Sequence, residues 1–209
     1  MVVVGHSIGA GVGATDTVYG GAALPGGIVL RDGGSTLTAW PSSGGAAPDP
    51  GVLPYLAASM QSGTIIRRAT PGQIVAGIET TELPGTLADC TALGIDRASV
   101  GLVIIMIGEN DAQTGVESAA YTTRLPQTLD AIERAYPNAR VVLQDMVTED
   151  ASYSEFAAIR AANVAAVALR SSRSLASRAG IGLHDTVHYS LAGYATAAAA
   201  QWAGWLATS

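Results

Sequence analysis

The sequence opens with Met1-Val2-Val3-Val4-Gly5-His6-Ser7, a short β-branched run that ends at a glycine and a serine. The run of valines predicts a buried strand, because strands covered on both faces lack polar alternation. Gly5 and the glycines that follow Ser7 allow a tight turn from which a side chain can project without Cβ clashes. Ser7 is therefore a candidate nucleophile at the carboxyl end of a strand, although a serine in this place can also serve only as a helix N-cap.

Apolar runs and helical periodicities alternate along the rest of the chain. We expect further strands near 64–67, 99–108, 140–143 and 180–183, with a short one at 27–31. We expect helices near 51–61, 84–93, the stretch before 136, 154–178 and after Ser190. This alternation predicts an α/β fold with a parallel sheet of about five strands and helices on both faces. Residues 1–209 are expected to form a single domain, with a Gly- and Pro-rich loop insert at about 20–54.

Composition excludes some classes of partner. Charged residues make up only 13% of the chain, the formal net charge is −6, and all basic residues are arginines. Because no basic patch is available for a phosphate backbone, we expect no nucleic-acid partner. No apolar run approaches ~18 residues, so no membrane span is expected. No signal peptide is visible, which leaves open a cytoplasmic protein or a secreted mature form. Cys90 is the one cysteine, so no intrachain disulfide is possible.

Polar residues and a glycine follow the predicted strands, at the edge where an open parallel sheet places its ligands. Together they supply the roles of acyl transfer. Ser7 would attack, and His188 would accept its proton as general base. Asp185 would orient His188 and stabilise its imidazolium form. The backbone N–H groups of Ser7 and Gly72 and the side-chain amide of Asn110 would donate to the oxyanion.

Four segments resemble the sequence blocks of SGNH (GDSL-type) hydrolases, and the resemblance covers nearly the whole chain. The segments are Gly5-His6-Ser7, Gly72, Gly108-Glu109-Asn110-Asp111 and Asp185-Thr186-Val187-His188. The resemblance implies a flavodoxin-like three-layer α/β/α fold, a Ser–His–Asp triad and no cofactor. Two departures stand out, because His6 replaces the usual aspartate and Thr70-Pro71-Gly72 replaces the usual Ser-Gly pair.

Residues 28–40, 51–57 and 108–112 are similar to the carbohydrate acetylesterase branch, the acetylxylan and sialate esterase relatives. Those relatives usually carry Gly-Gln-Ser-Asn in the first block and a serine in place of Asn110, and this chain has neither. The sequence thus predicts a serine esterase for short O-acyl esters, with small-molecule or carbohydrate acetyl esters as substrates. Trp40, His6 and Glu109 are candidates to contact the substrate. Trp40 suits stacking on a sugar or an acyl group, but it could equally hold its loop down.

Other functions stay open. The chain could act on longer acyl chains, as a lipase or thioesterase does, or be a non-catalytic glycan-binding module on the same fold. The segment from Gly5 to Gly9 also satisfies the Gly-x-Ser-x-Gly elbow of α/β-hydrolases, but that fold takes an oxyanion donor from a loop after an earlier strand, and none precedes. His184 and His188 have metal-ligand spacing, but a zinc site needs a third ligand and only His6 remains, so no metal is expected. His184 is also a rival for the general base.

Overall fold

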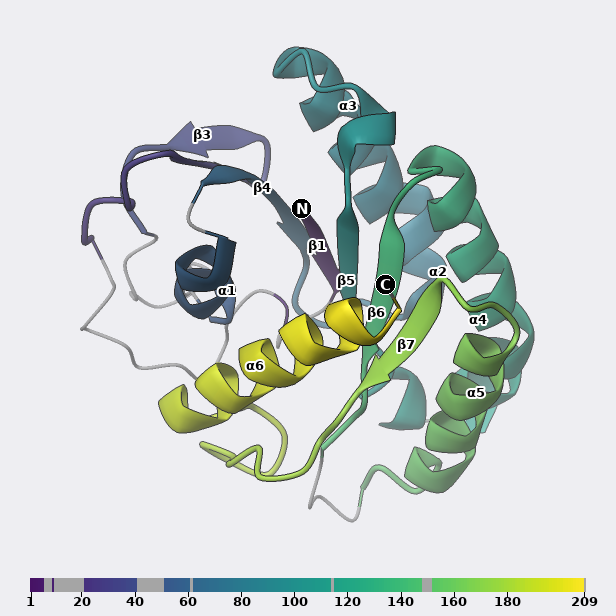
Figure 1. The fold of residues 1–209 in the computed structure, drawn as a ribbon. Helices are drawn as coiled ribbons and strands as arrows, with labels where there is room; N and C mark the ends of the chain where they lie inside the picture. Colours follow the sequence, from purple (N-terminus) through teal and green to yellow (C-terminus); the bar gives the residue numbers. More distant parts are fainter. Residues whose placement is uncertain are drawn as a thin grey trace.

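The computed structural model describes residues 1–5, 9, 21–40, 51–60, 62–113, 115–147 and 152–208. It contains a seven-stranded sheet with the order β3-β2-β4-β1-β5-β6-β7 (Figure 1). The strands are β1 (Val2–Gly5), β2 (Ile28–Asp32), β3 (Ser35–Leu37), β4 (Gly63–Ala69), β5 (Leu102–Met106), β6 (Arg140–Gln144) and β7 (Arg173–Ala176). All neighbouring strands are parallel except β2 and β3. The order from β4 to β7 is the flavodoxin-like order, as the sequence predicts.

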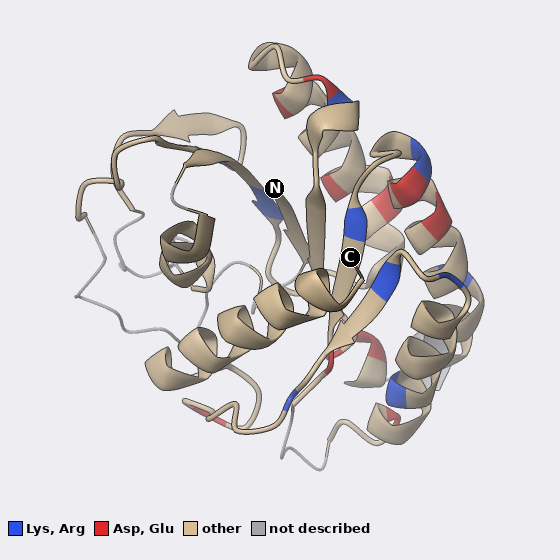
Figure 2. Ribbon diagram, viewed as in Figure 1, with Lys and Arg blue, Asp and Glu red and all other residues tan. Residues whose placement is uncertain are grey.

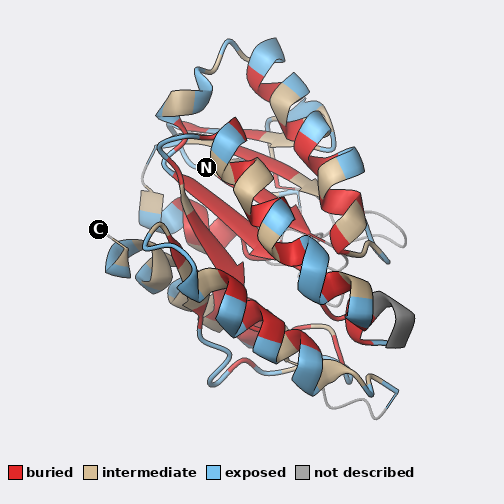
Figure 3. Ribbon diagram, turned by 90° about the vertical axis from the view of Figure 1, so that its right-hand side faces the viewer, coloured by how far each residue is buried: buried red, intermediate tan, exposed pale blue. Residues whose placement is uncertain are grey.

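Helices cover both faces of the sheet. The helical elements are α1 (Leu53–Met60), α2 (Val75–Gly77), η1 (Ile78–Glu82), α3 (Leu83–Ala92), η2 (Arg97–Ser99), η3 (Asp111–Gln113), α4 (Gly115–Ala135), α5 (Phe156–Ala168) and α6 (Leu191–Ala207). Strand residues alternate between the faces, so Val2 and Val4 pack with α2 to α5, whereas Val3 packs with α1 and α6. Figure 3 shows the buried strands between these layers. The predicted three-layer α/β/α architecture is confirmed.

The two helical layers differ in charge. Helices α1 and α6 contain no Asp, Glu, Lys or Arg, so they are entirely tan in Figure 2. Charged residues lie instead on α3, α4 and α5 and on the strands. None of the helices in the described ranges combines the length and apolar character that a membrane crossing requires.

The last strand lies earlier in the chain than the sequence predicts. The sequence predicts it at 180–183, but β7 is Arg173–Ala176, and α5 ends at Ala168 instead of 178. Arg173 is buried on β7 because its guanidinium forms ion pairs with Asp130 and Glu133 of α4. These partners are about 40 residues away in the chain. Arginine is rarely buried, so a local sequence pattern does not predict a buried strand at Arg173. The carboxylates that allow its burial are distant in the chain and are not part of that pattern.

Part of the Gly/Pro-rich insert extends the sheet. The strand predicted at 27–31 is confirmed as β2, which turns into antiparallel β3 through Gly33 and Gly34. These glycines have φ values of 55° and 93°, as a two-residue hairpin turn of the I′ type requires. The rest of the predicted insert includes residues 41–50, which lie outside the described residues.

Candidate active site

The carboxyl ends of three central strands meet where the sequence predicts the nucleophile. Gly5 ends β1 and is paired with Ala69 of β4 on one side and Met106 of β5 on the other. The backbone N–H of Thr70 donates to the Gly5 carbonyl at 3.0 Å. A Cβ atom at Gly5 would overlap the Met106 carbonyl oxygen, so only glycine fits here.

Ser7 and His6 follow Gly5 directly but lie outside the described residues. Their assignments as nucleophile, oxyanion donor and substrate contact therefore stay predictions. The strand end that precedes them lies between two parallel neighbours, which is the edge where open α/β sheets bind ligands.

Gly72 lies in an exposed turn after β4. Its φ is +78°, and the Gln73 N–H donates to the Thr70 carbonyl at 3.2 Å. Pro71 followed by a glycine with positive φ is typical of a tight turn, since proline presets φ and glycine accepts the left-handed conformation. The departure from the Ser-Gly pair of the family thus still produces a turn with an exposed glycine at this position.

Asn110 is joined to the Gly72 turn. Its side-chain Nδ2 donates to the Gln73 carbonyl at 3.0 Å, and the residue is half-buried. An amide nitrogen carries two hydrogens, so this bond fixes the side chain and leaves a second donor for another acceptor. The structure therefore brings two predicted oxyanion donors, Gly72 and Asn110, into one connected unit. Sequence reasoning missed the Gln73 carbonyl, because every residue type carries that group.

Asp111 anchors the loop after β5. Its side chain is 0% exposed, and its two carboxylate oxygens lie 3.1 and 3.2 Å from the Val75 N–H, which donates to them. Val75 begins the helical run through α2, η1 and α3, where free backbone N–H groups favour a negative charge. The carboxylate therefore ties the Asn110 loop to the segment that follows the Gly72 turn.

Glu109 is buried rather than open to solvent. Its side chain is 3% exposed, which favours a structural role over the predicted substrate contact. Burial raises the pKa of Tyr121 and Tyr189, and the charge of Glu109 adds to the increase in both. Tyr189 follows His188 in the chain, and Glu109 precedes Asn110. Because the charge of Glu109 acts on Tyr189, the His188 loop and the Asn110 loop lie near each other at this edge of the sheet.

Asp185 and His188 form a hydrogen-bonded pair. Asp185 Oδ2 lies 2.8 Å from His188 Nδ1, and Asp185 Oδ1 accepts from the backbone N–H groups of His188 at 2.7 Å and Val187 at 2.8 Å. Burial alone would raise the pKa of Asp185, but these N–H groups and the imidazole together lower it to about 2. With Nδ1 bound to the carboxylate, Nε2 is the ring nitrogen that would take up a proton if His188 acts as a general base.

The loop that carries this pair is closed by backbone hydrogen bonds. The Ser190 N–H donates to the Gly182 carbonyl at 2.9 Å, and the His184 N–H donates to the His188 carbonyl at 2.7 Å. The Ser190 hydroxyl accepts from the Gly193 N–H at 3.1 Å and caps α6, as predicted. The segment predicted as a strand at 180–183 is thus one side of the loop that presents His188.

His184 is exposed, and in the described part of the chain it is His188 that bonds a carboxylate. This arrangement favours His188 over His184 as the general base. Among the described residues, no three His, Cys, Asp or Glu side chains come together as a metal site would need.

Trp40 is packed inside the protein. Its side chain is 4% exposed and belongs to the core cluster on the α1 and α6 face. Its backbone bonds to Gly21 and Ala22, with the Trp40 N–H donating to the Ala22 carbonyl at 2.8 Å. This burial favours the alternative in which Trp40 anchors its loop to the core. A buried ring does not offer a surface on which a substrate could stack.

No protein-family model and no curated protein matches the chain. Solved structures do match. A protein from Arabidopsis thaliana superposes with a TM-score of 0.74 at 12% identity, over 98% of this chain and 97% of that chain. A carbohydrate esterase family 2 enzyme with a carbohydrate-binding domain, from Corynascus thermopiles (Myceliophthora fergusii), gives 0.64 at 15% identity over 99% of this chain and 65% of that chain.

A variant of an acetyl xylan esterase from Geobacillus stearothermophilus gives a TM-score of 0.58 at 14% identity, over 98% of this chain and 93% of that chain. TesA and a GDSL-like lipase are also among the matched structures. Identities this low establish the fold and leave the chemistry to the site. The chain has the three-layer α/β/α fold of the SGNH (GDSL-type) hydrolases.

Proposed function

We propose that this chain is a serine esterase that hydrolyses short O-acyl esters, with acetyl groups on carbohydrate as the favoured substrates. The observation that carries the proposal is the Asp185–His188 pair, in which a carboxylate holds Nδ1 of the imidazole at 2.8 Å. A second observation supports it, because the Asn110 side chain donates to the carbonyl of Gln73, next to Gly72, and Thr70 of the same turn donates to Gly5 at the end of β1.

In the proposed reaction, the Ser7 hydroxyl attacks the ester carbonyl while Nε2 of His188 accepts the hydroxyl proton. The carbonyl oxygen becomes an oxyanion, to which the N–H groups of Ser7 and Gly72 and the Asn110 amide donate. His188 then returns the proton to the leaving alcohol. A water molecule, activated by His188, releases the acyl group from Ser7 and regenerates the enzyme.

Relatives by fold support the choice of substrate. Two of the matched structures are a carbohydrate esterase and an acetyl xylan esterase, in agreement with the sequence resemblance to the carbohydrate acetylesterase branch. Lipases and TesA share the same fold, so acyl-chain length is the first property to measure.

The test is hydrolysis of p-nitrophenyl esters from acetate to octanoate by the wild type and by Ser7→Ala. We expect activity that falls as the acyl chain lengthens and that is lost in Ser7→Ala. The matched control is Ser59→Ala, since Ser59 is an exposed serine on α1 whose hydroxyl bonds the Tyr55 carbonyl of the same helix. This control should keep wild-type activity.

Acetylated xylan and acetylated sialic acid are the next substrates, to identify the alcohol part of the ester. A preference for octanoate would replace the proposal with a lipase or thioesterase function. Wild-type protein that binds glycans without hydrolysing any ester would make the chain a binding module, and full activity in Ser7→Ala would reject Ser7 as nucleophile.

A further inference from the structure

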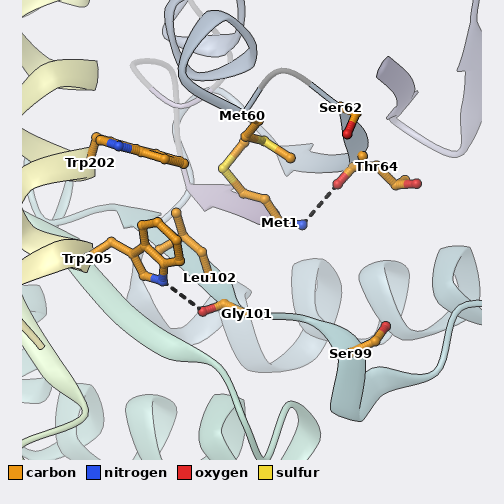
Figure 4. Close-up of a pocket in the computed structure, with 10 residues that line it drawn as sticks. Met1, Met60, Ser62, Thr64, Ser99, Gly101, Leu102, Trp202 and Trp205 are labelled. Atoms are coloured by element: carbon orange, nitrogen blue, oxygen red, sulfur yellow. Dashed lines mark hydrogen bonds between the residues drawn. The ribbon is translucent and has the colours of Figure 1, made fainter. Parts of the chain in front are cut away.

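A cavity of about 340 Å³ opens at the amino ends of the central strands, the edge opposite Gly5 and the His188 loop. The starts of β4 and β5 line it from one side, and the second half of α6 lines it from the other (Figure 4). Because α6 rises about 1.5 Å per residue, Trp202 lies roughly 18 Å along the helix from the Ser190 cap. The cavity is therefore separate from the candidate active site.

Two tryptophans of α6 dominate one wall of this cavity. The rings of Trp202 and Trp205 have centroids 4.7 Å apart and planes inclined by 49°, and both residues are half-buried. Nε1 of Trp205 donates to the Gly101 carbonyl at 3.1 Å, which fixes the orientation of that ring (Figure 4). Indole rings at a half-open cavity offer a large, rigid apolar surface with little entropy to lose on binding.

The rest of the lining combines apolar and polar groups. Met1, Met60 and Leu102 line the cavity together with Ser62, Thr64 and Ser99, and none of these side chains is ionisable. The amino group of Met1 donates to the Thr64 carbonyl at 2.9 Å, and burial lowers its pKa to about 6. The neighbouring layer of α1 and α6 also carries no charged residue (Figure 2). An ionic ligand would find no charged side chain in this lining, whereas a neutral ligand with an apolar face and a polar edge could contact the indoles and the hydroxyls together.

We propose that this cavity binds a sugar ring of a neutral polysaccharide. A pyranose ring has an apolar C–H face, which would stack on the indoles, and hydroxyls at its edge, which would exchange hydrogen bonds with the serines and the threonine. The inference extends the proposed carbohydrate esterase function by adding a second contact with a polymeric substrate. Binding here requires no turnover, so the two proposals can be tested separately.

The experiment is calorimetric titration of the protein with xylohexaose, cellohexaose and mannohexaose, all free of acetyl groups. We expect at least one of them to bind, and we expect Trp202→Ala to weaken that binding roughly tenfold. Trp202→Phe keeps an aromatic face and should retain most of the affinity. Leu206→Ala is the matched control, because Leu206 is 54% exposed on the same helix and does not line the cavity.

Thermal unfolding and p-nitrophenyl acetate hydrolysis accompany each variant, and both should stay at the wild-type level in Trp202→Ala. The proposal is overturned if none of the three hexaoses binds, or if Trp202→Ala binds the hexaose as tightly as the wild type does. Protein that binds a hexaose through Trp202 but hydrolyses no ester would support this inference and reject the proposed esterase.

Discussion

Two loops at the carboxyl edge of the sheet each contain an aspartate beside a candidate functional residue, and they use it differently. Asp111, next to Asn110, is 0% exposed, and its carboxylate accepts from the backbone N–H of Val75. Asp185, three residues before His188, has a side chain that is 48% exposed and holds the imidazole. One carboxylate fastens a loop to a helix start, whereas the other orients a base. Residue type alone therefore does not separate support of the fold from support of the chemistry.

The largest effect should come from the His188 loop. We expect His188→Ala to lower kcat by about 10⁴-fold or more, and Asp185→Asn to lower it by less, because another acceptor can partly orient the ring. Both variants should unfold near the wild-type temperature. Steady-state kinetics with p-nitrophenyl acetate, with thermal unfolding beside it, measures both expectations.

His184→Ala is the matched control, since His184 lies exposed in the same loop and should be nearly silent. Losses that are equal in the two test variants, or larger in Asp185→Asn, would contradict the expected order. A collapse of activity in His184→Ala would move the role of base to that residue.

The opposite pattern is expected at Asp111. Asp111→Ala leaves the buried Val75 N–H without its acceptor, so we expect the free energy of unfolding to fall by about 2 kcal/mol. Urea denaturation of this variant beside Asp185→Ala measures the contrast, and the second variant should lose no more than ~1 kcal/mol. Activity per folded molecule should suffer less in Asp111→Ala than in Asp185→Asn, because Asn110 keeps its separate bond to Gln73. Equal losses of stability in the two alanine variants would remove the distinction between the loops.

The smallest effect concerns pH. Burial would raise the pKa of Asp185, but hydrogen bonds from His188 and Val187 lower it to about 2, below the value of ~3.9 typical of an unfolded chain. A depressed pKa stabilises the folded state above about pH 4, and this contribution disappears as pH falls toward 2. Because the side chain is 48% exposed, we expect no more than ~1 kcal/mol.

Urea unfolding of the wild type and of Asp185→Asn at several pH values between 2.5 and 6 measures this contribution. The difference in stability between the two proteins should shrink as pH decreases. A difference that stays constant over this range would mean that the charge of Asp185 adds nothing to stability.

Local sequence patterns predicted the central strands well and the edges of the sheet less well. The apolar run that became β5 is buried at every position, so its pattern reports its place directly. β7 contains Arg173, whose burial depends on two carboxylates of α4, and no local pattern contains that information. β3 was missed, because a strand of three residues with two exposed polar side chains carries almost no apolar signal.

The candidate site divides in a similar way. The spacing of Asp185 and His188 predicts their contact, because three residues in one loop reach each other without help from the rest of the fold. The bond from Asn110 to Gln73 joins residues 37 positions apart, so only the arrangement of β4 and β5 around β1 produces it. Burial of Trp40 and Glu109 also depends on distant segments, and for this reason the sequence suggested more open roles for both.

The contact between Asn110 and the Gln73 carbonyl has a consequence for how this site can change over evolutionary time. A main-chain oxygen is present whichever amino acid occupies position 73, so the contact places no demand on that side chain. The contact instead requires particular residue types at positions 71 and 72, where Pro71 and Gly72 shape the turn, and an amide side chain at position 110. Selection on this part of the site would therefore conserve a backbone path, and a comparison of residue identities at position 73 would not detect it.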